Sequence, residues 1–538
     1  MVTRLEADFV IIGSGLAGSL IADHLSASGA RVLVIEAGAP VGRTRALQHF
    51  WDAPVKTPES AYPPLPQAMH PVSHDLDGWY RQSGPDLFKS TYLKVVGGTT
   101  WHWLGTCLRL LPSDFRTRTR FGYGVDWPID YATLEPFYVR AEHALGVSGD
   151  DDEDLGSPRS AGFVQPAIAP TYLDRQLESA LSGTRFQVRA TPQARNSRPF
   201  DGRPACCGSS SCIPVCPIQA KYDATVHLNR AVAAGAQLLD KASVVRLEVD
   251  ETATVRSAHF RRWDGSRGQA VGKAFVIAAN AVETPRLLLA SRTAAWPDGL
   301  ANSSGQLGRN LMDHPVQLSW ALADAPLYPY RGPLSTSGIE NLREGDFRRE
   351  RSAYRIEIGN DGWSWPAGAP VSTAAGLAAQ GLDAATLDAT LAHDTARHLR
   401  LSALTEQLPE ARNRVTLDAR EADHYGVPLP RLHYDIGDYA RRGLERARAD
   451  HDDIMRLLGC SHIRHADTFF GAGHIMGTAR MGADPRRSVV DGGLCSHDHP
   501  NLFLAGAGVF PTCGTANPSL TIAALSLRLA QALADRTR

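Results

Sequence analysis

The sequence contains no uninterrupted apolar run of the ~20 residues that a transmembrane helix needs. It also lacks a strong charge of either sign, because 56 Lys and Arg residues stand against 57 Asp and Glu residues. The formal net charge of −1 gives no electrostatic case for binding nucleic acid or an anionic membrane. The opening MVTRLEADFVIIGSGLAGSL has no basic segment before its apolar run and no small-residue cleavage site, so we expect no signal peptide. Taken alone, this favours the cytoplasm.

Cysteine is also scarce, with eight residues in 538, which is too few for a disulfide framework in a chain of this length. Four of the eight nevertheless lie within the stretch CCGSSSCIPVC. Cys206, Cys212 and Cys216 are spaced C-x5-C-x3-C, and a proline follows the last of them. Thiolates in such a glycine- and serine-rich loop can hold an iron–sulfur cluster, and a final Cys-Pro also occurs in ferredoxins. Structural zinc usually uses C-x2-C pairs, which are missing here, and a disulfide stays possible.

The order of apolar segments predicts a dinucleotide-binding domain built from separated parts of the chain. A short apolar run at 8–12, a helical stretch to residue 28 and a second apolar run at 31–38 form a βαβ unit. Similar pieces return in the middle and at the end, so a second domain is expected between them. The other predictions are an irregular Pro-rich segment at 40–90, two strands and a helix at 241–291, a charged helix at 438–458, a strand at 501–508 and a helix at 520–534.

Gly13, Gly15 and Gly18 fit the pattern G-x-G-x-x-G between the first strand and its helix. The first glycine permits a tight turn, the second lets a pyrophosphate approach the backbone, and the third allows close helix packing. The phosphate would then lie at a helix N-terminus. Glu36 ends the second strand, where a carboxylate can bind a ribose hydroxyl. A dinucleotide is therefore predicted, and the N-terminal position of the motif favours FAD over NAD.

Two further segments hold residues that suit alcohol oxidation or cofactor binding. His474 lies in GHIMGTARMG, and Asn517 directly precedes the predicted last helix. A histidine can take an alcohol proton because its ordinary pKa lies near neutrality, and an asparagine can hydrogen-bond the same oxygen. Asn517 also suits a helix N-cap. The glycine turn at 97–100 is either a second phosphate-binding turn or an ordinary loop, and His102 lies between two tryptophans.

With these pieces in this order, the chain resembles the glucose-methanol-choline (GMC) oxidoreductase family of flavoproteins. The matching stretches are DFVIIGSGLAGSL with Glu36, VVGGTTWHW, AANAVETPRLLLAS, GQLGRNLMDHP, HIMGTARMG and NLFLAGAGVFPTCGTANPSLTIAA. Within the family, ARNSRPFDGRPACCGSSSCIPVCPIQAKYDA makes it most similar to catalytic subunits of bacterial membrane-bound FAD-dependent glucose, gluconate and sorbitol dehydrogenases. A departure is LFLAGAG, which lacks the acidic residue common in the family's last flavin strand.

The resemblance implies an α/β fold with a GMC-type, Rossmann-like FAD-binding domain that is discontinuous in sequence and an inserted α+β substrate-binding domain. The expected FAD-binding parts are residues 1–159, 226–320 and 471–538. The expected substrate-domain parts are residues 160–225, with the cysteine loop, and 321–470. The expected FAD-binding residues are Gly13, Gly15, Gly18, Glu36, Gly97, Gly98, Thr99, His102 and Val244. His102 occupies the position that is covalently linked to the flavin in some family members.

The resemblance also implies a reaction and partners. His474 would take the hydroxyl proton of a sugar or polyol while Asn517 orients the oxygen and hydride passes to the flavin. Cys206, Cys212 and Cys216 would hold a three-iron, four-sulfur (3Fe-4S) cluster, which favours a dehydrogenase similar to glucose dehydrogenase. Cys207 would then be a packed residue outside the ligand set, and the alternative is a fourth ligand that completes a four-iron cluster. The implied partners are a small subunit with a twin-arginine export signal and a multihaem cytochrome c subunit. Membrane association would come only through them, and the periplasm then outweighs the cytoplasm.

Two alternatives stay open. The first is a GMC oxidase that uses oxygen and has a purely structural cysteine loop. The second is a non-enzymatic scaffold or sensor that contains flavin and iron. The sequence names neither the sugar nor the carbon that is oxidised, because residues 321–400, where specificity is expected, hold no readable motif.

Overall fold

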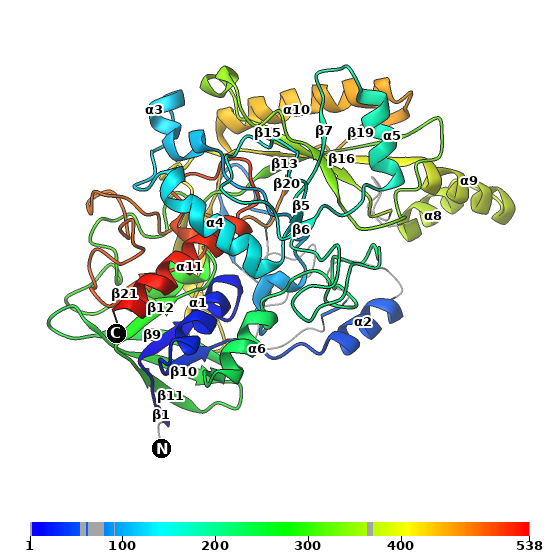
Figure 1. The fold of residues 1–538 in the computed structure, drawn as a ribbon. Helices are drawn as coiled ribbons and strands as arrows, with labels where there is room; N and C mark the ends of the chain where they lie inside the picture. The colour runs from blue at the N-terminus through cyan, green and yellow to red at the C-terminus, as the bar shows by residue number, and fades with distance from the viewer. Residues whose placement is uncertain (1–2, 54–60, 63–79, 91, 363–369, 537–538) are drawn as a thin grey trace.

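The computed structural model describes residues 3–53, 61–62, 80–90, 92–362 and 370–536. The glycine turn that begins at Gly13 follows β2, a strand of a five-stranded parallel sheet in the lower half of the molecule (Figure 1). The strand order is β21-β12-β2-β3-β8, and every neighbouring pair is parallel. β2, β3 and β12 are fully buried, as expected for short apolar strands with helices on both faces. The bounds are β2 (Phe9–Ile12), β3 (Val32–Ile35), β8 (Gln237–Leu239), β12 (Ala274–Ile277) and β21 (Leu502–Leu504).

Helices from distant parts of the chain pack together beside this sheet. α1 (Leu16–Ala27) contacts α6 (Thr225–Ala233) and α11 (Ser519–Asp535), and α11 also contacts α4 (Tyr131–Leu145). In Figure 1 the blue, green and red segments accordingly lie together in the lower half of the molecule. The two ends and the middle of the chain thus build one nucleotide-binding unit.

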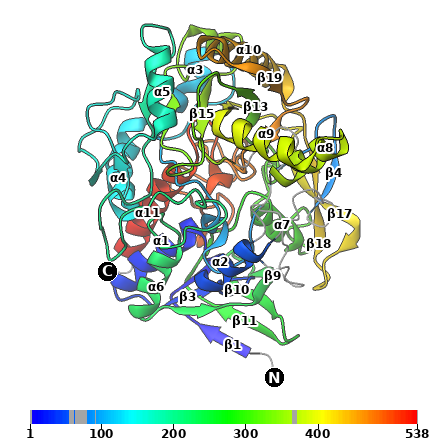
Figure 2. The same ribbon diagram turned by 90° about the vertical axis from the view of Figure 1, so that its right-hand side faces the viewer.

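A second main sheet is antiparallel and has seven strands, in the order β19-β13-β16-β15-β14-β7 with β20 beside β13. The long helix α10 (Gly437–Leu457) packs against β13 and β16, along the top of the molecule in Figures 1 and 2. The bounds are β7 (Val188–Ala190), β13 (Pro315–Leu322), β14 (Ser337–Ile339), β15 (Tyr354–Gly359), β16 (His398–Thr405), β19 (Ser461–His465) and β20 (Phe470–Gly471).

Smaller sheets flank these two. The four-stranded sheet consists of β1 (Thr3–Glu6), β11 (Arg267–Val271), β10 (Val255–Arg262) and β9 (Ala242–Val249). The others pair β17 (Arg414–Ala422), β18 (Pro428–His433) and β4 (Arg81–Ser83), and β5 (Ser148–Gly149) with β6 (Gln165–Pro166). The remaining helices are α2 (Arg43–Asp52), α3 (Thr117–Phe121), α5 (Tyr172–Leu181), α7 (Glu283–Ala290), α8 (Pro370–Ala379) and α9 (Ala384–Arg397).

The α/β fold class predicted from the sequence is confirmed, and α10 begins and ends within one residue of its predicted bounds. The segment 241–291 differs from expectation because four strands, not two, precede its helix. The segment 40–90 contains α2 and β4, while its residues 54–60 and 63–79 lie outside the described residues. The expected domain boundary at residue 320 falls inside β13. Across the described ranges, no helix is long and apolar enough to cross a membrane.

Candidate functional site

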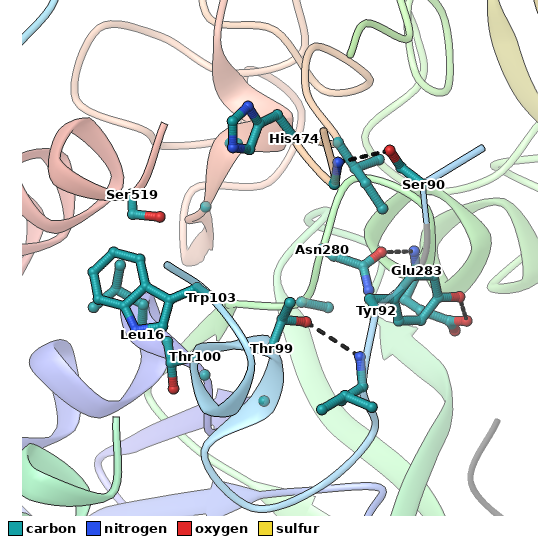
Figure 3. Close-up of a pocket in the computed structure, with 18 of the residues that line it drawn as sticks. Leu16, Ser90, Tyr92, Thr99, Thr100, Trp103, Asn280, Glu283, His474 and Ser519 are labelled. Carbon is teal, nitrogen blue, oxygen red and sulfur yellow. Dashed lines mark hydrogen bonds between the residues drawn. The ribbon is translucent and has the colours of Figure 1, made fainter. Parts of the chain in front are cut away.

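A cavity of about 750 Å³ extends from the glycine turn after β2 to the antiparallel sheet. Its lining includes residues of the first βα turn, the second glycine turn, β9, β16 and the start of α11. Figure 3 shows Thr99 and Thr100 of the second turn on one side and His474 on the other, with Ser519 of α11 between. The cavity therefore joins most of the segments that the sequence singled out.

The first glycine turn has the geometry that a close phosphate approach requires. Gly13 has a φ of +104°, and a Cβ there would lie 2.8 Å from the carbonyl oxygen of Ala278. A Cβ on Gly18 would lie 2.0 Å from the Gly13 carbonyl oxygen, so α1 packs directly on the turn. Gly15 is the N-cap residue of α1, and a Cβ there would meet nothing within 4 Å. The start of α1 thus borders open space in the cavity, as an anion site at a helix N-terminus needs.

Glu36 lies at the end of β3 and lines the same part of the cavity. Its Oε2 accepts hydrogen bonds from Ser14 N at 3.0 Å and Ser14 Oγ at 2.7 Å, and its Oε1 accepts one from Gly38 N at 2.9 Å. Burial raises the pKa of the Glu36 carboxyl, although these hydrogen bonds act in the opposite direction. Oε1, which accepts only one of these bonds, keeps acceptor capacity for a ribose hydroxyl. Val244 of β9 also lines the cavity.

The second glycine turn packs against the first. Gly97 donates its N–H to Ser14 Oγ at 3.1 Å, and a Cβ on Gly98 would lie 3.2 Å from the Cα of Gly15. Both Gly97 and Gly98 have positive φ, at +94° and +57°. Thr99 and His102 line the cavity, as does Gly98. Gly97 and Gly18 do not line the cavity, so they contribute to the packing of the two turns and not to the cavity surface.

His474 and Asn517 meet in the cavity wall, where Asn517 Nδ2 lies 3.4 Å from His474 Nε2. Behind them, His314 has its Nδ1 at 2.7 Å from His474 Nδ1 and its Nε2 at 3.0 Å from the carbonyl oxygen of Gly514. A carbonyl only accepts, so Nε2 of His314 carries the proton and its neutral Nδ1 accepts from His474. His474 therefore presents an unprotonated Nε2 to the cavity.

Burial keeps both imidazoles neutral. It lowers the pKa of His314 to about 4, and together with the nearby His314 and Arg355 it lowers the pKa of His474 well below its ordinary value. A neutral His474 suits the role of a base that is ready to accept a proton near pH 7. Asn517 Oδ1 is buried without a hydrogen-bond partner among the described residues, so it can accept a bond from a substrate hydroxyl.

Asn517 does not cap α11, although its position before the helix suggested this as an alternative. The N-cap residue is Pro518, and no side-chain capping hydrogen bond is formed. The amide of Asn517 points instead towards His474. Its role is therefore tied to the cavity.

Asp313 holds the histidine pair from the backbone side, a role that sequence reasoning missed. Its Oδ1 accepts from the N–H groups of His314 at 2.7 Å and His474 at 3.0 Å, and Ser90 Oγ donates to its Oδ2. Burial raises the pKa of Asp313 to about 6 against these hydrogen bonds. The available signal was the adjacent polar pair Asp313 and His314 in the apolar setting of NLMDHP.

The cysteine loop lies next to the cavity, which Ile213 of the loop helps to line. Cys212 and Cys216 are buried, Cys206 is half-buried and Cys207 is exposed. Gly208 N and Lys221 N each lie 3.4 Å from a sulfur, that of Cys206 and that of Cys216 respectively. The Cys206 thiol also interacts electrostatically with Cys212 and Cys216, so the three expected ligands lie close together while Cys207 faces solvent.

Two buried cations, Lys221 and Arg195, connect this loop with the second glycine turn. Lys221 Nζ donates to the carbonyl oxygens of Trp101 at 2.9 Å and Trp103 at 2.5 Å. Arg195 Nη2 donates to the Leu104 carbonyl at 3.0 Å. In the described part of the chain neither cation forms an ion pair with an acid, since Asp223, which interacts electrostatically with Lys221, pairs with Arg43 at 2.6 Å. Arg195 interacts electrostatically with Cys206. Buried positive charges of this kind suit a nearby anionic group.

These surroundings fit both expected cofactors. The two glycine turns, Glu36 and the cavity between them and His474 fit a flavin dinucleotide. Three gathered thiols with N–H donors and two unpaired cations fit an anionic iron–sulfur cluster. No set of three or more His, Cys, Asp or Glu side chains among the described residues is placed to hold a single metal ion. An iron–sulfur cluster does not require such a set, because each thiolate binds a different iron atom.

Comparison with known proteins gives matches over nearly the whole chain. Family models described as GMC oxidoreductase match residues 7–316 and 409–526. The sequence is 38% identical to the fructose dehydrogenase large subunit of Gluconobacter japonicus, over 98% of each chain. It is 29% identical to paromamine 6'-oxidase of Streptomyces fradiae, over 98% of this chain and 91% of that one. A formate oxidase structure aligns with a TM-score of 0.67 at 15% identity, over 100% of this chain and 99% of that one.

Proposed function

Because the chain belongs to the GMC oxidoreductase family, whose members are flavin-dependent enzymes acting on CH–OH donors, we propose that it is a sugar dehydrogenase. The proposed substrate is a sugar, glycoside or polyol. The observation that carries this proposal is the neutral His474 beside Asn517 in a cavity that begins at a dinucleotide-binding turn. Glucose, expected from the sequence, and fructose, the sugar in the relative's name, are the first substrates to test.

In the proposed reaction His474 Nε2 accepts the proton of the substrate hydroxyl, which approaches between His474 and Asn517. The 3.4 Å separation from Asn517 Nδ2 is long for a hydrogen bond, so the hydroxyl can replace it. Asn517 Nδ2 then donates to the hydroxyl oxygen and fixes its orientation. FAD, held by the two glycine turns and Glu36, supplies the hydride acceptor when bound. A placed base contributes about 10²–10⁴-fold to such a reaction.

We further propose that Cys206, Cys212 and Cys216 hold a 3Fe-4S cluster, with Cys207 outside the ligand set. Such a cluster supplies one-electron transfer, which favours a cytochrome c or dye acceptor over oxygen. The gathered thiols and the unpaired cations Lys221 and Arg195 support this assignment. The relative named a large subunit supports partner subunits, and we propose a small twin-arginine-exported subunit and a multihaem cytochrome c. Export with the former would bring the chain to the periplasm.

The proposal is tested by adding sugars to the purified flavoprotein without air. We expect the right sugar to bleach the flavin spectrum, and a dye acceptor to be reduced much faster than oxygen is consumed. Bleaching excludes a scaffold or sensor. A protein that bleaches, contains no iron and reduces oxygen rapidly is instead an oxidase with a structural cysteine loop, as the similarity to paromamine 6'-oxidase would then suggest.

A further inference from the structure

One wall of the cavity is the face of the seven-stranded sheet that α10 does not cover. Three apolar residues of β16 pack in the core beside α10, namely Leu399, Leu401 and Ala403. Side chains alternate along a strand, so Arg400, Ser402 and Leu404 point to the other face. All three of these line the cavity. On β15, Glu357 alternates in the same way with the core residues Ile356 and Ile358, and it also lines the cavity.

The strand register arranges these side chains in rows. Glu357 stands directly opposite Ser402, and such opposite residues have Cβ atoms about 5 Å apart. Arg400 lies in the next row, two residues from Ser402 on the side away from Leu404, and this step is about 6.7 Å along the strand. Two polar rows therefore follow one another on this wall.

The preceding row adjoins the catalytic histidine. Arg355 stands opposite Leu404 and is close enough to His474 to help lower its pKa. Glu357 and Ser402 are thus one strand step away from the residues beside His474. A sugar whose reacting hydroxyl lies at His474 would place its remote hydroxyls against them.

Two polar atoms of this wall have no hydrogen-bond partner within the described ranges. They are the Oγ of Ser402, a residue only 3% exposed, and the Nε of Arg400. Burying a donor or acceptor without a partner is unfavourable, so such atoms in a cavity wall indicate a polar ligand. Glu357 adds a carboxylate that accepts from Arg355 Nη1 and keeps further acceptor capacity.

Both cations of the wall are already paired with carboxylates. Arg400 pairs with Asp361 at 3.1 Å, and Arg355 pairs with both Glu340 and Glu357. A sugar acid would therefore find no unpaired cation on the described part of this wall. An alkyl alcohol would leave the polar atoms without partners. The wall suits a neutral molecule that carries several hydroxyl groups.

We propose that Glu357, Ser402 and Arg400 bind the hydroxyl groups of a neutral sugar that lie away from the oxidised carbon. Glu357 accepts hydrogen bonds, Arg400 Nε donates one, and Ser402 can do either. This assignment rests on the proposed function, since it places the reacting hydroxyl at His474. It identifies the specificity-determining part of the segment after residue 321 as alternate positions of β15 and β16.

The test uses the holoenzyme, a dye acceptor and three kinds of substrate: the best neutral sugar, its monodeoxy analogues and the sugar acid of the same skeleton. Ser402→Ala and Glu357→Gln should each raise KM for the neutral sugar by about tenfold, with kcat changed less than about threefold. One deoxy sugar should react as poorly with the wild type as the parent sugar does with Ser402→Ala. KM for that deoxy sugar should not rise further in Ser402→Ala, because the same hydrogen bond is already missing.

Ser319→Ala is the matched control, since Ser319 lies in the same sheet on the face towards α10 and bonds His451 at 2.8 Å. It should leave KM unchanged. Unchanged KM in both Ser402→Ala and Glu357→Gln, or a wild-type preference for the sugar acid, would overturn this assignment while sugar oxidation stands. A wild-type flavin that no sugar reduces overturns the proposed function and this assignment together.

Discussion

Nδ1 of His314 lies 2.7 Å from Nδ1 of His474, and the Gly514 carbonyl beyond it makes His314 the acceptor of that pair. One backbone oxygen thus determines which nitrogen of His474 is free to act as a base. His314 does not line the cavity. It is a positioning residue that acts through His474.

His314→Ala should lower kcat by about 10²-fold, because His474 would lose the partner that fixes its tautomer and orientation. His314→Gln should keep most of the rate, since an amide can donate to Gly514 and accept from His474. The folded pKa of His474 lies below its ordinary value, so its base form persists as pH falls below 6.5. Both variants leave the burial that is the main cause of this lowering, so the acid limb of kcat/KM should stay below pH 6.5 in each. An acid limb at or above pH 6.5 would contradict this.

His474→Ala should retain the flavin and lose about 10²–10⁴-fold in turnover, because the base is gone and the glycine turns are untouched. Asn517→Ala should be milder, since it removes a hydrogen bond to the substrate oxygen and leaves the base. Thermal unfolding should change little in Asn517→Ala because this residue caps no helix. Stopped-flow flavin reduction measures both rates, and near-normal reduction in His474→Ala would remove this histidine from the mechanism.

Replacing Cys206, Cys212 or Cys216 by serine should lower iron content and remove an electron paramagnetic resonance signal near g = 2, which a cluster with an odd electron count gives. Cys207→Ser is the matched control, because Cys207 is exposed while Cys212 and Cys216 are buried and Cys206 is half-buried. Dye reduction should partly survive in the cluster-deficient variants, while cytochrome reduction should not. Cytochrome reduction at the wild-type rate without iron would assign the loop a structural role.

Acid precipitation should leave yellow colour in the supernatant, because we expect FAD to be held without a covalent bond. His102 lies at the cavity, and its ring stands edge-on to Tyr62 with centroids 6.4 Å apart. This position is compatible with the alternative, a bond between the flavin and His102. Colour that stays in the pellet, and moves to the supernatant in His102→Ala, would establish that alternative.

The sequence predicted the parts of the site that depend on local pattern. Gly13, Gly15 and Glu36 follow from the order of a βαβ unit, since the turn, the helix start and the second strand end are neighbours in any such fold. Arg195 and Lys221 could not be found this way, because the backbone carbonyls that they bind lie about a hundred residues away in the sequence. Ser402 was not predicted for a similar reason. Alternation shows that β16 has two faces, but only tertiary packing decides which face lines the cavity.

Lys221 would link the assembly of the two proposed cofactors. Its backbone N–H reaches the sulfur of Cys216, and its ammonium holds the carbonyls on either side of His102. A cell short of iron would leave this lysine without the proposed anionic cluster, and the turn it supports is one that we propose to hold FAD. Iron supply would then govern how much active flavoprotein matures, even though iron takes no part in breaking the C–H bond.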